Sequence, residues 1–250
     1  MNFFKNLLKP SPPPPPPPPP PVPLQLPKIT SPTAAQIAQS SQPSPAALQL
    51  LTPQQTPSQY LSVLQEKQMG DEMVKTMAHG LPDREGVMWA AQSAGKVADK
   101  LPPADAQAME AAQVWAKNPT TPNQAAAAAA AAKTDYRGPG ALAAQGAAWA
   151  QPAMPVAVPA GAPPAPRLTP HAVAGAVLLA SAIAANPKLA APKIQAPALA
   201  LPTLEVPQLA MPTLGPPPTI PPEVQAQTFR AQHPFIAMGL DIASGKTPLA

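Results

Sequence analysis

Residues that could carry out chemistry are few and widely spaced in this chain of 250 residues. Cysteine is absent, which excludes disulfides, thiol nucleophiles and cysteine-ligated metals. The three histidines, His79, His171 and His233, lie far apart in the sequence, and none has a helical histidine or carboxylate partner at i+3 or i+4. A zinc site would require them to converge with a fourth ligand. We therefore expect no bound metal, and histidines at helix ends that interact with the terminal dipoles.

The carboxylates do not form a catalytic pattern either. We expect them at helix starts or on polar helix faces, at Asp71, Glu72, Asp83, Glu85, Asp105 and Glu110. A Gly-x-Ser-x-Gly nucleophile elbow is also missing from the sequence. The sequence thus predicts a protein that is not an enzyme, with no catalytic residue and no cofactor.

Two glycine motifs resemble phosphate-binding loops. Residues 138–143 match G-x-G-x-x-A, but the polar stretch 133–137 precedes them where a dinucleotide-binding fold has a buried strand, so we expect a helix-breaking loop. Gly245, Lys246 and Thr247 look like the end of a P-loop, but the preceding glycine, Gly239, is one residue too early. Neither motif predicts a nucleotide site.

The composition determines the fold class that we expect. The chain has 44 prolines, 11% charged residues and 4% aromatic residues, and alanine makes up much of its apolar content. Proline interrupts helices and central strands, so one continuous fold is excluded. A net charge of +4 is too small to indicate nucleic-acid binding. We predict an all-α protein, a small alanine-rich helical bundle interrupted by proline-rich extended segments, with a disordered proline-rich N-terminus.

Changes in composition divide the chain into six parts. They are a disordered hook and polyproline spacer (1–56), the first part of a helical domain (57–150), a proline-rich connector (151–168), a buried apolar helix (169–186), an extended pentad repeat (187–222) and a C-terminal helix that completes the bundle (223–250). The apolar stretch at 172–185 is shorter than the 17 to 25 residues that span a bilayer, and the first ten residues do not form a secretory signal.

The N-terminus pairs a short apolar hook with a rigid spacer. Phe3, Phe4, Leu7 and Leu8 fall on one face of a short helix, and ten consecutive prolines follow at 12–21. In polyproline II geometry this run would extend roughly 30 Å. The pattern from Lys9 to Pro15 also fits the basic ligands of proline-recognition domains, although rigid spacing explains the run equally simply. The expected partner contacts in this region are Phe3, Phe4, Leu7, Leu8, Pro12, Pro15, Pro18 and Pro21.

Helix start and stop signals recur from Thr56 onward. Thr56–Gln59 is a capping box that opens a helix reaching about His79, and Asp83 begins a second helix that ends near Lys100. Three further helices are expected at 103–117, at the alanine run that follows a second capping box at 121–124, and at 139–150. A helix at 170–185 should follow a Thr169 cap, and the last helix, at 223–244, should have a break or kink at Pro234. Trp89, Trp115 and Trp149 should fill a shared centre.

A five-residue repeat occupies the region after the sixth helix. Prolines recur every five residues from Pro187 to Pro212, each followed two places later by Leu or Ile. An odd period cannot place all the leucines on one face of a strand. We expect an extended segment whose leucines either lie over the bundle or bind a partner, with Leu199, Leu204 and Leu209 as candidate contacts.

Three segments together resemble an uncharacterised bacterial all-helical domain family. They are residues 111–132 (AAQVWAKNPTTPNQAAAAAAAA), 168–187 (LTPHAVAGAVLLASAIAANP) and 234–246 (PFIAMGLDIASGK). The resemblance implies an association with type VI secretion gene neighbourhoods and identifies no catalytic residues. Two features depart from the family pattern. Ala-Gln-Pro follows Trp149 where the family has Phe-Trp-Ser-Gly-Gly, and the pentad repeat replaces a shorter connection.

The function expected from these features is protein–protein interaction. We expect a non-enzymatic adaptor or chaperone-like accessory protein of a bacterial secretion apparatus, located in the bacterial cytoplasm, with protein partners and no nucleic acid. The alternative is a secreted effector whose proline run binds proline-recognition domains. The hook suits either a protein or a membrane surface, and a protein is favoured because one short apolar segment anchors weakly to lipid.

Overall fold

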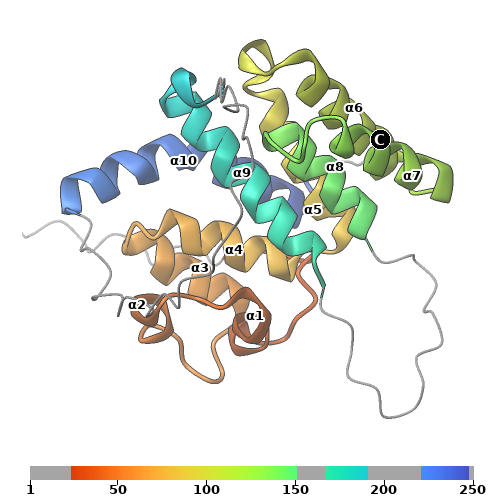
Figure 1. The fold of residues 1–250 in the computed structure, drawn as a ribbon. Helices are drawn as coiled ribbons and strands as arrows, with labels where there is room; N and C mark the ends of the chain where they lie inside the picture. The colour runs from red at the N-terminus through yellow and green to blue at the C-terminus, as the bar shows by residue number, and fades with distance from the viewer. Residues whose placement is uncertain (1–23, 151–166, 191–220, 248–250) are drawn as a thin grey trace, which may run out of the picture.

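The computed structural model describes residues 24–150, 167–190 and 221–247. All the regular secondary structure in these residues is helical (Figure 1). The all-α prediction is confirmed. The α-helices are α1 (Ala34–Ser41), α2 (Pro45–Leu48), α3 (Pro57–Glu66), α4 (Gly70–Gly80), α5 (Asp83–Gly95), α6 (Pro103–Lys117), α7 (Thr121–Ala132), α8 (Pro139–Trp149), α9 (Thr169–Ala185) and α10 (Pro222–Ala243). Two short 3₁₀ helices, η1 (Ala98–Lys100) and η2 (Pro187–Ala190), follow α5 and α9.

Helices α5, α8 and α9 pack against one another at the centre of the bundle. Helices α6 and α7 pack beside α8, while α4 and α10 lie against α9 (Figure 1). The facing surfaces consist mostly of alanine, and Ala90, Ala91, Ala144, Ala147 and Ala176 are fully buried. Such small side chains let helix axes approach closely. The core therefore consists of closely packed backbones as much as of large apolar side chains.

The apolar helix predicted in the second half of the chain is α9, and it is a core helix. Ala172, Val173, Val177, Ala180 and Ile183 on it are at most 4% exposed. Among the described residues, no helix combines the length and the apolar character that crossing a membrane requires.

The boundary predicted for the disordered N-terminus is wrong over residues 24–56. Ile29, Ala34, Ile37 and Ala47 are buried there and belong to the core. The backbone N–H of Lys28 also donates to the carbonyl of Ala243 at 3.1 Å, which ties the start of the folded body to its end. The scattered apolar residues of this polar, proline-rich stretch bury enough surface to order it, and composition alone does not reveal this.

The helix predicted from Thr56 to His79 is two helices. Its start is as expected, because Thr56 accepts from the N–H of Gln59 while the Gln59 side chain accepts from the N–H of Thr56 at 2.9 Å. The helix ends at Glu66 because Gln68 takes the left-handed conformation, with φ of 55°, and α4 begins at Gly70. This turn separates α3 from α4, so that α4 enters the bundle in a different direction from α3.

Two other expected caps differ from the structure. Thr120, and not Thr121, caps α7 by accepting from the N–H of Asn123, and Gln124 instead donates to the carbonyls of Ala147, Ala148 and Ala150 at the end of α8. Thr169 is the first residue of α9, and its hydroxyl donates to the carbonyl of Gly146 at 3.1 Å. In both cases a side chain that could cap its own helix serves a neighbouring helix.

Helix ends and one tryptophan also depart from expectation. Helix α5 ends at Gly95, short of the expected Lys100, and of the break or kink expected at Pro234 the break does not occur, because α10 includes Pro234. Trp89 and Trp115 are buried, but Trp149 is 43% exposed at the last residue of α8. The prediction of three tryptophans in one centre is therefore wrong for Trp149, which lies at the bundle edge where α8 ends.

The contact of α10 with the core depends on a glycine. Trp89 donates its indole N–H to the carbonyl of Phe235 at 2.9 Å, which fixes α10 against α5. A Cβ at Gly239 would lie 2.4 Å from Met77 Cε and 2.6 Å from Trp89 Cε2. No side chain fits at this position, so α10 can approach Trp89 only because residue 239 is glycine.

We predict that Gly239→Ala destabilises the fold by about 1–3 kcal/mol, because the methyl group overpacks the contact with Trp89. The matched control is Gly86→Ala, another buried helical glycine, whose Cβ would meet Val173 at an ordinary 3.4 Å. That control should be neutral or stabilising, since alanine favours helix. Chemical denaturation of both variants measures the difference, and equal midpoints would contradict the close approach.

Candidate functional site

The predicted partner contacts all lie outside the described residues. They are Phe3, Phe4, Leu7, Leu8, Pro12, Pro15, Pro18, Pro21, Leu199, Leu204 and Leu209. What the structure describes is the body to which these segments attach, and the polar and titratable groups that this body carries.

The attachment point of the polyproline run is part of the folded body. Leu24 and Leu26 pack against the core, and Ile29 is buried. The Lys28 ammonium lies 3.1 Å from Glu85 Oε1, in addition to the backbone bond from Lys28 to α10. The chain is therefore held three residues after Pro21, the last proline of the run.

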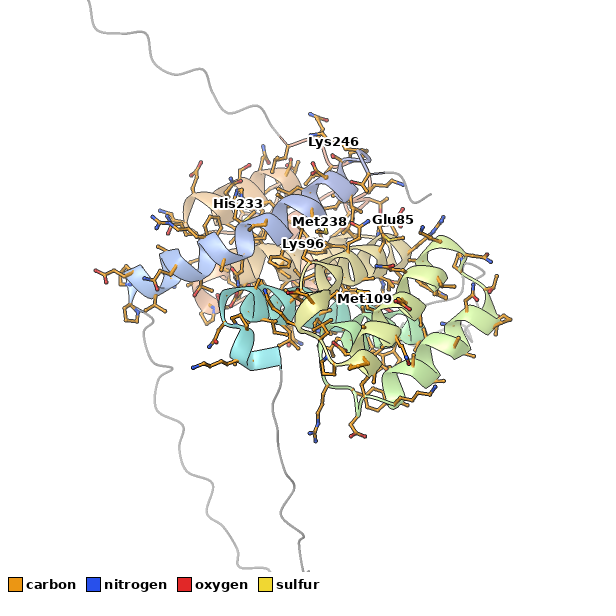
Figure 2. All side chains as sticks on the ribbon, turned by 90° about the horizontal axis from the view of Figure 1, so that it is seen from above. Glu85, Lys96, Met109, His233, Met238 and Lys246 are labelled. Carbon is orange, nitrogen blue, oxygen red and sulfur yellow. The ribbon has the colours of Figure 1, made fainter. Side chains whose placement is uncertain are left out.

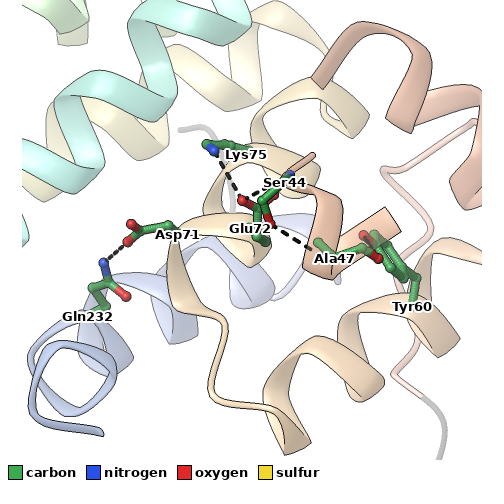
Figure 3. A network of polar contacts seen from close by, with 7 residues as sticks. All are labelled: Ser44, Ala47, Tyr60, Asp71, Glu72, Lys75 and Gln232. Atoms are coloured by element: carbon green, nitrogen blue, oxygen red, sulfur yellow. Dashed lines mark hydrogen bonds and ion pairs between the residues drawn. The ribbon is translucent and has the colours of Figure 1, made fainter. Parts of the chain in front are cut away.

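A polar network surrounds the start of α4 (Figure 3). Glu72 is 6% exposed, and its Oε1 accepts from Lys75 Nζ at 3.2 Å and from the N–H of Ser44 at 3.4 Å. Tyr60 donates its hydroxyl to the carbonyl of Ala47, and burial together with the nearby Glu72 charge raises its pKa to about 12. On the other side of α4, Gln232 donates to Asp71. These contacts join α2, α3, α4 and α10.

Three of the carboxylates that were expected at helix starts or on polar faces lie at helix starts and are also buried. Glu72, Glu85 and Asp105 are 6%, 8% and 1% exposed, respectively. Each occupies the first turn of its own helix, as expected, but tertiary packing covers it. A carboxylate buried in this way needs partners from other elements to offset its lost hydration.

Asp105 finds those partners at the start of α8. Its Oδ1 accepts from the N–H of Ala141 at 2.6 Å, and its Oδ2 accepts from the N–H of Gly140 at 3.3 Å. Burial raises the pKa of the Asp105 carboxyl, and the two hydrogen bonds oppose that rise. The side chain of a residue on α6 thus satisfies N–H groups that the α8 terminus leaves open.

This contact explains the G-x-G-x-x-A motif at 138–143. A Cβ at Gly138, where φ is 106°, would lie 2.5 Å from the Asp105 carboxyl, and a Cβ at Gly140 would lie 2.1 Å from the Asp105 carbonyl oxygen. Both glycines are required for the close approach of α8 to α6. Only Gly138 of this motif lies in a loop, because residues 139–143 begin α8, so the loop prediction holds at Gly138 alone. The helix N-terminus that a dinucleotide would use is filled by the protein's own carboxylate.

Two of the three histidines come together, which sequence spacing did not reveal. The rings of His79 on α4 and His171 on α9 make an edge contact, with centroids 4.7 Å apart, while Ser40 Oγ lies 3.1 Å from His79 Nδ1. His79 is buried and His171 is exposed beside a 320 Å³ cavity that both line. Burial, His171 and Arg167 lower the pKa of His79 to about 4, so its ring is neutral near pH 7. His233 is exposed on α10 (Figure 2), where its ring contacts Phe229 with centroids 6.4 Å apart.

The buried carboxylates and His79 make hydrogen bonds that hold helices together. Within residues 24–150, 167–190 and 221–247, no three histidines or carboxylates lie close enough to hold a metal ion together. The buried polar side chains instead link helices that are distant in sequence. The sequence did not reveal these pairs, because the partner of each side chain depends on which helices become neighbours.

Comparison with known proteins places the chain in a family. A family model described as "Family of unknown function (DUF6931)" matches residues 60–201, which is more than half of the chain. The chain belongs to this family. The expected membership in an uncharacterised domain family is therefore confirmed. No curated protein and no solved structure matches the chain.

We predict that Asp105→Ala destabilises the fold by about 2–4 kcal/mol, because two buried N–H groups of α8 lose their acceptor. Asp105→Asn keeps one acceptor oxygen and should lose less. Glu110→Ala, an exposed carboxylate on the same helix, is the matched control and should change stability by less than about 0.5 kcal/mol. Urea denaturation would show these differences, and equal loss from Glu110→Ala would contradict the capping role.

The His79 environment predicts a loss of stability in acid. Because its pKa is 6.5 in the unfolded chain and about 4 when folded, only the unfolded chain binds the proton between these values. Stability should fall from pH 7 to pH 4, and the His79 contribution to this fall is on the order of 2–3 kcal/mol.

The His79→Gln variant should lack that part of the pH dependence, whereas the exposed His233→Gln control should retain it. Thermal melts of the wild type and both variants between pH 4 and pH 7.5 test this difference. Parallel curves for the wild type and His79→Gln would show that His79 does not titrate as described.

Proposed function

We propose that this protein is a non-enzymatic adaptor, in which a rigid helical body holds one partner and presents an apolar N-terminal hook to another. The hook consists of Phe3, Phe4, Leu7 and Leu8, and the ten prolines that follow it act as the spacer. The single observation that carries this proposal is the fixed attachment of the chain at Leu24–Ile29, immediately after the spacer.

A stiff spacer can position its tip only if its other end is attached at a fixed point. A polyproline segment extends about 3.1 Å per residue and bends little over a few residues. When such a rod leaves a rigid body, it confines its tip to a limited volume. A weak hook held in this way gains effective concentration from the contact that the body makes first.

The partner that we propose is a component of a bacterial secretion apparatus. This proposal rests on the resemblance of residues 111–132, 168–187 and 234–246 to a family found in type VI secretion gene neighbourhoods. The protein would then act in the bacterial cytoplasm, at the apparatus. The hook would bind a protein surface, because one short apolar segment anchors weakly to a membrane.

A second candidate function follows from the proline run itself. The segment from Lys9 to Pro15 fits the ligand pattern of proline-recognition domains, which bind preformed polyproline II helices. In that case the protein would be a secreted effector, and it would be found in the culture supernatant instead of the cell pellet. The hook would then be dispensable, whereas the prolines would not.

We predict that replacing the four hook residues by serine reduces recovery of the partner at least about tenfold in affinity purification from the native cell. The melting temperature should not change, because the hook precedes the attachment at Leu24. The matched control is Asn2→Ser/Asn6→Ser, which alters the same short segment at polar positions and should leave recovery intact.

The outcomes separate the candidate functions. Normal recovery from the serine variant would reject the hook, and retention of partners only while the ten prolines are present would favour the proline-recognition function. Truncations should stop at Pro23, because residues 24–56 belong to the folded body and their removal would disturb α3 and α4.

A further inference from the structure

The described structure includes the first unit of the pentad repeat. Its leucine, Leu189, lies in η2 directly after α9 and is 50% exposed. This side chain lines two cavities. The leucine that begins the repeat therefore lies at the junction of two hollows in the surface.

Both cavities offer apolar walls. The first has a volume of 450 Å³, and its apolar lining includes Leu101, Leu142 and Ile183. The second has a volume of 500 Å³ and lies between α9 and α10, where Leu178 and Val224 are its apolar lining and polar side chains, including those of Asp71 and Gln232, form the rest of the wall. Each volume exceeds that of several aliphatic side chains, so each cavity could bury more than Leu189 supplies.

The rest of the repeat begins and ends at this surface. The thirty residues 191–220 leave the described chain next to Leu189. They return at Pro221, three residues before Val224, which is 48% exposed and lines the second cavity. A segment tethered at both ends to the rim of a cavity has a high effective concentration there, so it outcompetes a free molecule of the same chemistry.

The chemistry of the segment matches that of the cavities. It contains only two charged residues, Lys193 and Glu205, and it presents an aliphatic side chain every five residues at Ile194, Leu199, Leu204, Leu209 and Leu214. Its prolines have no N–H group, so fewer backbone donors need a partner when the segment lies on an apolar surface.

We infer that the two cavities beside Leu189 are the docking site of the chain's own pentad repeat, residues 191–220, whose later leucines insert into them. The first unit places the start of the repeat at the site, because Leu189 contributes to both cavity walls. This inference decides between the two roles that the sequence left open for the repeat, and it assigns the leucines to the bundle. It does not depend on the hook or on the identity of a partner.

The test uses a single thiol in the full chain, which has no natural cysteine. Ala182→Cys places the thiol in the second cavity, and its rate of modification by a maleimide reports access to that cavity. Adding Leu199→Ser, Leu204→Ser and Leu209→Ser should raise the rate about tenfold, because the docked state loses its apolar anchors. The matched control replaces the preceding residues, Ala198→Ser, Thr203→Ser and Gln208→Ser, and should leave the rate unchanged.

Two further measurements keep the inference falsifiable if the leucine variants disturb the fold. A thiol at Val114, exposed on α6, should react at the same rate in every background. With all the leucines intact, a short bismaleimide should join Ala182→Cys to Thr203→Cys within one chain. Absence of this crosslink would overturn the inference.

Other occupants give different results. Equal labelling rates with and without the three leucines would overturn self-docking. A rate that rises on dilution of the protein would assign the cavities to a second copy of the chain. A rate that rises when the hook residues become serine, but not when the repeat leucines do, would assign them to the hook. Each of these results would replace the proposed occupant.

Discussion

Small side chains at the contacts of α5, α8 and α9 are the constraint on which the rest of the structure depends. Alanines such as Ala91, Ala144 and Ala176 let these helices approach closely. Glycine is required where even a methyl group is too large, at Gly140 where α8 meets α6 and at Gly239 where α10 meets α5. Close approach brings backbone groups of one helix within reach of side chains on the next. The contacts of Trp89 with Phe235 and of Asp105 with Ala141 both result from it.

The same close packing explains why this protein buries polar groups that elsewhere would lie on the surface. A core made largely of alanine has little bulk, so neighbouring helices cover most of α4 and the N-terminal turn of α6. Glu72, His79 and Asp105 are covered for this reason, and each makes a hydrogen bond that joins two helices. Such bonds add specificity, because only one arrangement of the helices satisfies them all. At His79, burial also lowers the pKa of the ring, which keeps the ring neutral near pH 7.

The proline-rich segments are significant because of where the body holds them. The N-terminal run ends at a point fixed by Leu24–Ile29, and the pentad repeat begins at Leu189, which lines two cavities, and returns near Val224, which lines one of them. The bundle determines at which points of its surface these segments are attached. The proposed adaptor role and the proposed self-docking of the repeat both follow from this division between a rigid body and tethered segments.

The sequence by itself determined the fold class and most helix starts, because these depend on interactions within one turn. The capping box at Thr56, the prolines in the first turns and the alanine runs all act locally, and the structure bears them out. Only the tertiary structure decided that residues 24–56 are ordered, that Trp149 is exposed, and that His79 meets His171. It also decided that Asp105 serves α8. These outcomes depend on which distant helices become neighbours, and no local pattern encodes that choice because burial and pairing arise from the packing of the whole bundle.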